Sequence, residues 1–446
     1  MNTVKQATKR KQSTVRHTRA VQSDRSKRPL VAPPAGEVVE RLQELVLPAA
    51  QKVQAGAFGP GLRLRKLTLV VMMAFILSLI WRHVGNITQG ARLLNIEGLL
   101  WTGMVNVSQQ ALSLRMGSLC SDLFLEVLVA LLPVWHSRSR DRKRPLPPEV
   151  QWAQDRYSQV AICDGSTLDA LLRKIGLLRG AATHPLAGRM TALLDMCSRL
   201  PWHVWYEPDS NAHDQRFWPK IIKALNPGAL LIFDLGYTNF KVFLDLTCSG
   251  IYWLTRAKSN LSYQVAATLF RSSSVHDQLI WVGDRTEKQL VRLIAVLYHG
   301  KWYRYLTSEL DSDRLPTEYV VALYWQRWRI EDAYFIVKRL LGLAYFYTGS
   351  ENGVCMQLWA TWILYAILVD MTDSVAEALD KPFAQISIEM VYQNLYFYQQ
   401  AFKRGEATDL VTYLTANSED FGIVKRTSQK NPLALLKALL TNDPGP

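Results

Sequence analysis

The chain of 446 residues is long enough for two or three domains, and its 49% hydrophobic content is sufficient for large cores. Residues 1–150 contain 22 Lys/Arg against 9 Asp/Glu, and this region holds nearly all of the net charge of +14. Such asymmetry predicts a polyanionic partner, either nucleic acid or an anionic membrane. Five scattered cysteines, odd in number and without a CxxC pair, argue against a disulfide framework and against a zinc site.

Residues 1–35 carry nine Lys/Arg among polar residues and predict a disordered basic tail. Residues 36–136 have helical periodicity and are interpreted as a helical DNA-binding domain. Its apolar run at 67–81 has fifteen residues, whereas a membrane span needs about twenty. We therefore expect a buried core helix and no membrane partner. The polar N-terminus has no apolar signal region, so we expect a cytoplasmic protein, associated with the nucleoid when bound to DNA.

Two short segments, at 106–118 and 137–150, have patterns of their own. The stretch 106–118 predicts a short helix capped by Ser108, with Gln109, Gln110 and Arg115 exposed. It is a candidate recognition helix, although ordinary short helices have the same pattern. Residues 137–150, a basic run that ends in three prolines, are interpreted as a linker.

The remainder predicts an α/β fold with a mixed sheet, because short apolar runs are interrupted by two helical stretches. The expected strands are 159–163, 190–196, 203–207, 229–233 and 250–258, and the expected helices are 213–225 and 237–247. Alternating patterns at 278–283, 289–298 and 301–308 predict a β-rich insert. The resulting segments are a first core part at 151–258, an insert at 259–316, a second core part at 317–372 and a helical C-terminal region at 373–446.

Asp164 and Asp234 each follow an apolar strand and precede a glycine by one or two positions. Reacting groups gather at the carboxyl ends of strands in α/β sheets. Either residue alone is more often an aspartate that opens a turn or caps a helix. Asp195, Asp245 and Asp332 are competing acids with weaker contexts.

The segment 324–338 spaces Tyr324, Arg327, Glu331 and Lys338 along one stripe of a helix. The alternative is a solvated face joined by an Arg–Glu pair four residues apart. Large apolar residues on both neighbouring faces indicate instead that the stripe faces another polar group.

Asp164, Asp234 and Glu331 form a set of three carboxylates without a nearby histidine. Such oxygen donors match Mg²⁺ or Mn²⁺, and two ions can support an in-line phosphoryl displacement. Arg327, Lys338 and Tyr324 would then hold the DNA phosphates.

The pattern Y-x2-R-x3-E-x6-K, with CDGST around Asp164 and FDLGY around Asp234, resembles bacterial insertion-sequence transposases of the DDE class, of the insertion sequence four type. The resemblance covers about residues 155 to 350. It implies a ribonuclease H-like core interrupted by the insert. The three acids would bind two Mg²⁺, for which Mn²⁺ can substitute, and the enzyme would cut and rejoin DNA.

The resemblance also implies roles for further residues and for partners. Trp302 or Tyr303 would stack a flipped base, Tyr324, Arg327 and Lys338 would hold the backbone beside it, and Arg256 and Lys258 would contact phosphates. The partners would be double-stranded terminal inverted repeats, target DNA and a second copy in a synaptic homodimer. Two alternatives remain, a nuclease that cuts without joining and a non-catalytic DNA-binding derivative.

Overall fold

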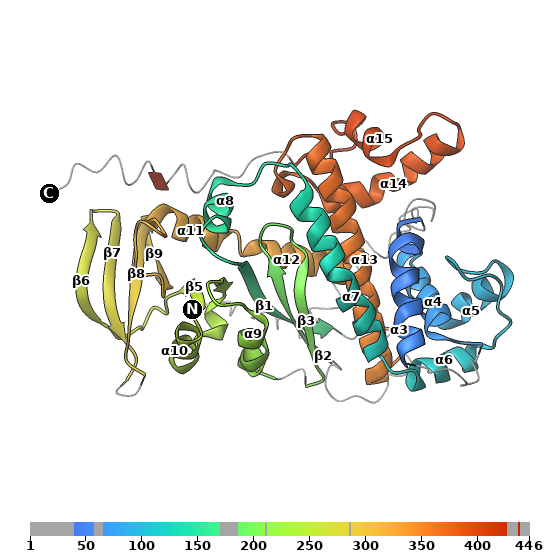
Figure 1. Ribbon diagram of the computed structural model, residues 1–446, viewed down its shortest axis with the longest axis horizontal. Coiled ribbons are helices and arrows are strands. Elements are labelled where there is room, and N and C mark those ends of the chain that lie inside the picture. Colours follow the sequence, from blue (N-terminus) through green and yellow to red (C-terminus); the bar gives the residue numbers. More distant parts are fainter. Residues whose placement is uncertain are drawn as a thin grey trace, which may run out of the picture.

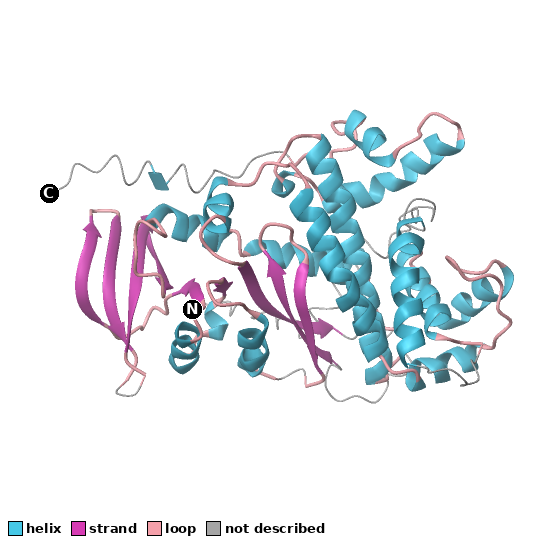
Figure 2. Ribbon diagram, in the orientation of Figure 1, coloured by secondary structure: helices cyan, strands magenta, loops and turns pink. Residues whose placement is uncertain are grey.

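The computed structural model describes residues 40–57, 66–169, 186–209, 212–284, 287–343, 345–425 and 436–437. Its strands gather in one half of the molecule and its longest helices in the other (Figures 1 and 2). The tail predicted at residues 1–35 lies outside the described residues.

The predicted helical character of residues 36–136 is confirmed for the described part. The elements are a π-helix at Leu42–Val46, α3 (Leu47–Ala57), α4 (Leu69–Trp81), α5 (Ile87–Ile96), α6 (Gln109–Ser118) and α7 (Asp122–Asp141). Helix α4 begins where the Thr68 side chain accepts a hydrogen bond from the Val71 amide, and most of α4 is buried. In α6, capped by Ser108, Arg115 donates to the Leu67 carbonyl oxygen at 2.8 Å, so this side chain is engaged within the protein.

Helix α13 (Glu351–Ala378) packs against α4 and α7 and joins the N-terminal helices to the rest of the molecule (Figure 1). Among the described residues it is long and apolar enough to cross a membrane, and α6 with α7 would qualify as one bent span. The apolar window of α13 is completely buried, which is typical of a core helix. The predicted boundary at residue 136 therefore divides a continuous hydrophobic core.

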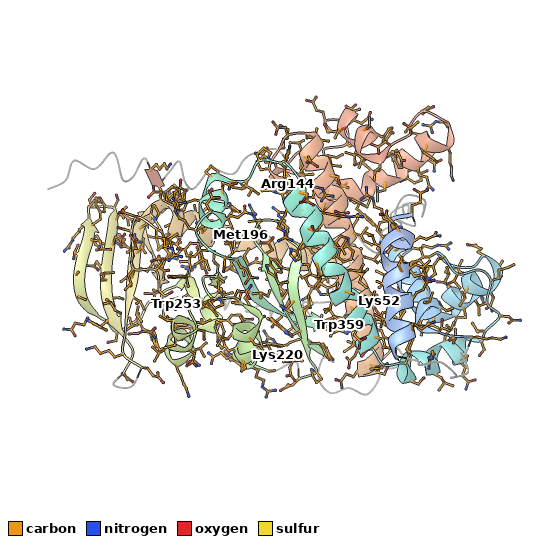
Figure 3. All side chains as sticks on the ribbon, in the orientation of Figure 1. Lys52, Arg144, Met196, Lys220, Trp253 and Trp359 are labelled. Atoms are coloured by element: carbon orange, nitrogen blue, oxygen red, sulfur yellow. The ribbon has the colours of Figure 1, made fainter. Side chains whose placement is uncertain are left out.

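The predicted linker at 137–150 is largely not a linker. Helix α7 continues to Asp141, and α8 (Pro148–Gln154) begins seven residues later. Arg142 and Arg144 bind Asp370 and Asp373 of α13, which fixes the connection to the core. Figure 3 labels Arg144 where the end of α7 meets α13.

The predicted mixed sheet is confirmed, and its strands match the expected runs. They are β1 (Val160–Asp169), β2 (Leu186–Asp195), β3 (Pro201–Glu207), β4 (Leu230–Phe233) and β5 (Tyr252–Arg256). β1 is parallel to β4 and antiparallel to β2, and β4 is parallel to β5. Helix α10 (Phe240–Cys248) provides the crossover between β4 and β5.

The insert does not form a separate sheet. Its strands are β6 (Gln264–Arg271), β7 (Val275–Val282), β8 (Gln289–Tyr298) and β9 (Lys301–Thr307). Because β9 pairs with β5, the described strands form one sheet in the order β3-β2-β1-β4-β5-β9-β8-β7-β6. β6 was not predicted from the sequence, because this edge strand is exposed along its whole length and has no buried apolar alternation.

Helices cover both faces of the sheet. A 3-10 turn at Asp214–Phe217, helix α9 (Trp218–Ala224) and α10 lie on one face, with a further 3-10 turn at Leu235–Tyr237. The other face carries α11 (Thr317–Trp325), α12 (Trp328–Phe335) and a π-helix at Ile336–Leu340 (Figure 1). A 3-10 turn at Phe383–Gln385, α14 (Ile388–Lys403) and α15 (Leu410–Ala416) complete the helical C-terminal region.

A buried ion pair joins the insert to α11. The Arg292 side chain is fully buried and donates from both Nε and Nη2 to the Asp277 carboxylate, at 2.8 and 2.5 Å. Arg292 Nη1 also donates to the Leu315 carbonyl oxygen, and the Thr317 hydroxyl donates to Asp277. These bonds tie β7 and β8 to the beginning of α11.

We predict that Arg292→Ala lowers the free energy of unfolding by about 3 to 5 kcal/mol, because it leaves the Asp277 carboxylate buried without its cation. Denaturant unfolding followed by circular dichroism measures this change. Arg404→Ala is the matched control, because it removes an arginine–carboxylate pair that is more than half exposed, and it should leave the free energy of unfolding nearly unchanged. Equal losses in the two variants would contradict the prediction.

Candidate active site

The sheet brings Asp164 and Asp234 to the same edge. In the parallel register Cys163 of β1 lies opposite Phe233 of β4, and each is followed directly by its aspartate. Ile162 and Ile232, two residues earlier, belong to the core on the α12 face. The alternation of side chains along a strand therefore directs both carboxylates towards α12, which carries Glu331.

The sequence predicts one continuous helix for the Tyr-Arg-Glu-Lys pattern, but in the structure this helix is broken. It breaks after Trp325, where the amides of Gln326 and Arg327 donate to carbonyl groups three residues earlier, at 3.0 and 3.1 Å. Such bonds tighten the backbone and end the α-helical ladder. The prediction of a single stripe along one ideal helix is therefore wrong, although the four residues of the pattern still lie near one another.

Arg327 lies between two of the predicted acids. Its Nη1 is 3.2 Å from Asp164 Oδ2, and its Nη2 is 3.1 Å from Glu331 Oε1. The Arg327 side chain is only 8% exposed and that of Asp164 20%, whereas that of Glu331 is 40% exposed. The predicted i, i+4 pair exists, and Arg327 extends it to Asp164 of β1.

The third carboxylate has a different partner. The Tyr324 hydroxyl donates to Asp234 Oδ1 at 3.0 Å, and the Tyr324 ring packs against Tyr305 of β9. Burial and the nearby Asp234 carboxylate raise the pKa of Tyr324, so the hydroxyl keeps its proton.

Tyr334 is a site residue that no sequence motif identified. Its hydroxyl donates to the Asp164 carbonyl oxygen at 2.6 Å and accepts from the Ala192 amide at 3.1 Å. This buried side chain therefore fixes α12 to β1 and β2 beside Asp164.

Lys338 donates to the carbonyl oxygen of Thr167 in β1, so it is close to the strand that carries Asp164.

Arg256 lies opposite Tyr305 in the β5–β9 pairing, and its guanidinium is 5.7 Å from the centre of the Tyr303 ring. Lys258 is exposed just after β5.

Neighbouring residues Trp302 and Tyr303 lie on opposite faces of β9. Tyr303 shares its face with Tyr305, which contacts Tyr324. Trp302 packs against His276 on the other face, with ring centres 4.7 Å apart. Of the two aromatic candidates, the structure therefore brings only Tyr303 to the side of the sheet that carries the acids.

A further carboxylate lies behind Asp164. Asp214 accepts a hydrogen bond from Arg189 of β2 at 2.5 Å. A Cβ atom added to Gly165 would be 2.1 Å from Asp214 Oδ1, so the glycine allows this approach. No sequence motif identified Asp214. The competing Asp195 accepts hydrogen bonds from the Ser198 amide and hydroxyl, which is a turn-forming role.

The donor set of Asp164, Asp234 and Glu331 fits a hard divalent cation, since it contains carboxylate oxygens only. The space between Asp164 and Glu331 already accommodates a positive group, the Arg327 guanidinium. Within the described residues, however, no three His, Cys, Asp or Glu side chains are grouped closely enough to form a ready metal site.

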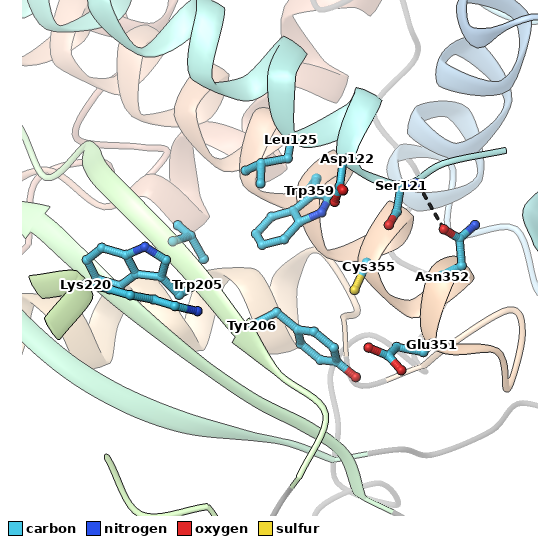
Figure 4. Close-up of a pocket in the computed structure, with 11 residues that line it drawn as sticks. Ser121, Asp122, Leu125, Trp205, Tyr206, Lys220, Glu351, Asn352, Cys355 and Trp359 are labelled. Carbon is cyan, nitrogen blue, oxygen red and sulfur yellow. Dashed lines mark hydrogen bonds between the residues drawn. The ribbon is translucent and has the colours of Figure 1, made fainter. Parts of the chain in front are cut away.

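A separate pocket of about 480 Å³ lies between β3, α7 and α13 (Figure 4). Its lining includes Trp205, Tyr206 and Trp359, with Asp122 and Glu351 at the beginnings of α7 and α13. None of the predicted site residues lines this pocket.

Residues 183–367 match the family model described as "Transposase DDE domain". The matched region contains Asp234 and Glu331 and begins after Asp164. A protein of Sinorhizobium fredii (strain NBRC 101917 / NGR234), named "Putative transposase y4zB", is 28% identical over 191 residues. That alignment covers 38% of this chain and 52% of the relative, so the chain spans about half the length of that protein. This chain is thus similar to transposases in both comparisons, and the domain match is to the DDE class.

Among solved structures, a synaptic complex of piggyBac transposase with hairpin DNA aligns over 90% of this chain and 86% of its own. The sequence identity is 9% and the TM-score is 0.38, which is too low for an argument about fold or function.

The buried Asp164 carboxyl provides a pH-dependent prediction. Burial raises its pKa to about 6, although Arg327 and the Gly165 amide act in the opposite direction. The folded protein therefore binds this proton more tightly than the unfolded chain, and the stability due to it is lost as pH rises from about 4 to about 6.5. For a side chain that is 20% exposed, we expect a loss on the order of 2 kcal/mol.

Denaturant unfolding at several pH values, in the presence of a chelator, measures this effect. Asp164→Asn is the reference, because it cannot titrate, and its stability should fall less over the same range. Parallel curves for the two proteins would show that Asp164 has an ordinary pKa.

Proposed function

We propose that this protein is a DNA transposase that binds the ends of an insertion sequence and catalyses metal-dependent strand cleavage and strand transfer. The observation that carries the proposal is that Asp164 and Asp234 follow neighbouring parallel strands and that Arg327 joins Asp164 to Glu331. The Tyr-Arg-Glu-Lys pattern supplies two of their partners, Arg327 and Tyr324. The DDE domain match over residues 183–367 supports the same reaction class. The proposal includes a ribonuclease H-like core formed by β1 to β5.

In this proposal the three carboxylates hold Mg²⁺, for which Mn²⁺ can substitute. When bound, two such ions would stabilise charge on the attacking and leaving oxygens of a phosphoryl transfer. Tyr334 and the packed face of α12 keep Asp164 and Glu331 in a fixed relation, because a small displacement of reacting groups is costly.

The remaining polar residues on this face would hold the DNA backbone. Arg327 offers a planar, bidentate group for a phosphate, whereas Lys338 offers a point charge near β1. Arg256 and Lys258 would contact phosphates beside the insert. We assign base stacking to Tyr303 because its ring lies on the acid-bearing side of β9, with Arg256 next to it.

The proposed partners are double-stranded terminal inverted repeats, target DNA and a second copy of the chain in a synaptic complex. The protein would act in the cytoplasm at the nucleoid. A nuclease that does not join DNA would use the same acids, so strand transfer is the step that distinguishes the two functions.

We predict that Asp164→Asn, Asp234→Asn and Glu331→Gln each lower cleavage and joining by about a thousandfold or more, because each removes a charge that the transition state requires. The assay uses the full chain, duplexes containing the ends of its own element, and Mg²⁺. Asp245→Asn is the control, since this exposed acid on α10 is remote from the sheet edge. Cleavage by the wild type without any joined product would favour the nuclease.

A second prediction concerns DNA binding. Arg256→Ala and Lys258→Ala should each reduce the slope of log affinity against log salt by about one, because each removes one phosphate contact. Titrations in EDTA at several salt concentrations measure the slope. Deleting residues 1–150 is not a suitable test, because these helices share the core with α13. Unchanged slopes would exclude this part of the proposed surface.

A further inference from the structure

Arg327 occupies an unusual position for a residue that is expected to hold DNA. Its guanidinium bridges Asp164 and Glu331, two of the three carboxylates proposed to bind metal. The Arg327 Nε atom is buried and has no hydrogen-bond partner among the described residues. The Arg327 guanidinium therefore binds two of the proposed metal ligands, and its Nε donor is still unused.

This arrangement has an electrostatic consequence. A guanidinium between two carboxylates engages oxygens that a metal would need and repels an incoming cation at short range. The third acid is also engaged, because Asp234 accepts the Tyr324 hydrogen bond at 3.0 Å. All three carboxylates of the proposed ligand set are thus engaged by the protein's own side chains.

Arg327 lies at the break between α11 and α12, where the α-helical hydrogen-bond ladder is interrupted. A DNA phosphate, like a carboxylate, offers two acceptor oxygens that an arginine can bind together, so it can exchange with these partners.

Resting on the proposed function, we propose that Arg327 lowers the metal affinity of the DNA-free protein and releases Asp164 and Glu331 when a DNA phosphate binds it. Metal loading then depends on DNA. Because binding free energies are reciprocal, bound metal strengthens DNA binding by the same factor. The site is therefore assembled for reaction chiefly when its substrate is present.

The test measures Mn²⁺ binding by electron paramagnetic resonance, without any reaction. The full chain is titrated alone and with a short DNA duplex at low ionic strength, and the duplex alone is the blank. We expect DNA to tighten Mn²⁺ binding to the wild type by about tenfold or more. Arg327→Ala should bind Mn²⁺ about tenfold more tightly than the wild type without DNA, and DNA should add little further.

Control variants separate this inference from the proposed function. Arg404→Ala, which removes an exposed arginine–carboxylate pair, should leave Mn²⁺ affinity unchanged. Asp164→Asn and Glu331→Gln should lose Mn²⁺ binding, and wild-type affinity in both would overturn the proposed metal site itself. If they lose binding while Arg327→Ala gains none, only the role of Arg327 is overturned. Arg327→Gln, which keeps a neutral donor, provides the same measurement if the alanine variant does not fold.

Discussion

Desolvation of the Asp164 carboxylate is the constraint on which the arrangement of this site depends. Asp164 and Asp234 follow neighbouring strands, Glu331 comes from α12, and partial burial makes a negative charge costly without a partner. Arg327 and Tyr324 meet this requirement from the same helical segment. The segment must therefore lie close to β1 and β4, and Tyr334 holds it there through the Asp164 carbonyl group.

The same physical requirement determines how the helical half is joined to the sheet half. Asp370 and Asp373 are almost completely buried on α13, and arginines from the N-terminal region neutralise them. The arginines that form these ion pairs are Arg41, Arg138, Arg142 and Arg144. Part of the positive charge that suggested nucleic-acid binding thus stabilises the fold. The remaining surplus is a smaller basis for DNA binding than the sequence count alone implies.

The sequence allowed prediction of the mixed sheet, most strands and the position of Asp164 and Asp234 at the ends of buried strands, because these follow from local apolar patterns. It did not predict β6, whose residues are exposed and lack a buried face. The break before Trp328 was missed because no glycine or proline marks it, and only hydrogen-bond geometry shows it. Asp214 and Tyr334 could not be identified, since their contacts join segments far apart in sequence.

The pairing of α7 with α13 also has a consequence for folding during synthesis. The two helices pack together, yet more than 200 residues separate the end of α7 at Asp141 from the beginning of α13 at Glu351. The ribosome must therefore synthesise the whole sheet before the apolar faces of the N-terminal helices can pack against α13. Contacts so distant in sequence form slowly, and until they form the exposed apolar surfaces of the N-terminal helices favour aggregation. We expect the nascent chain to need chaperones until α13 has emerged.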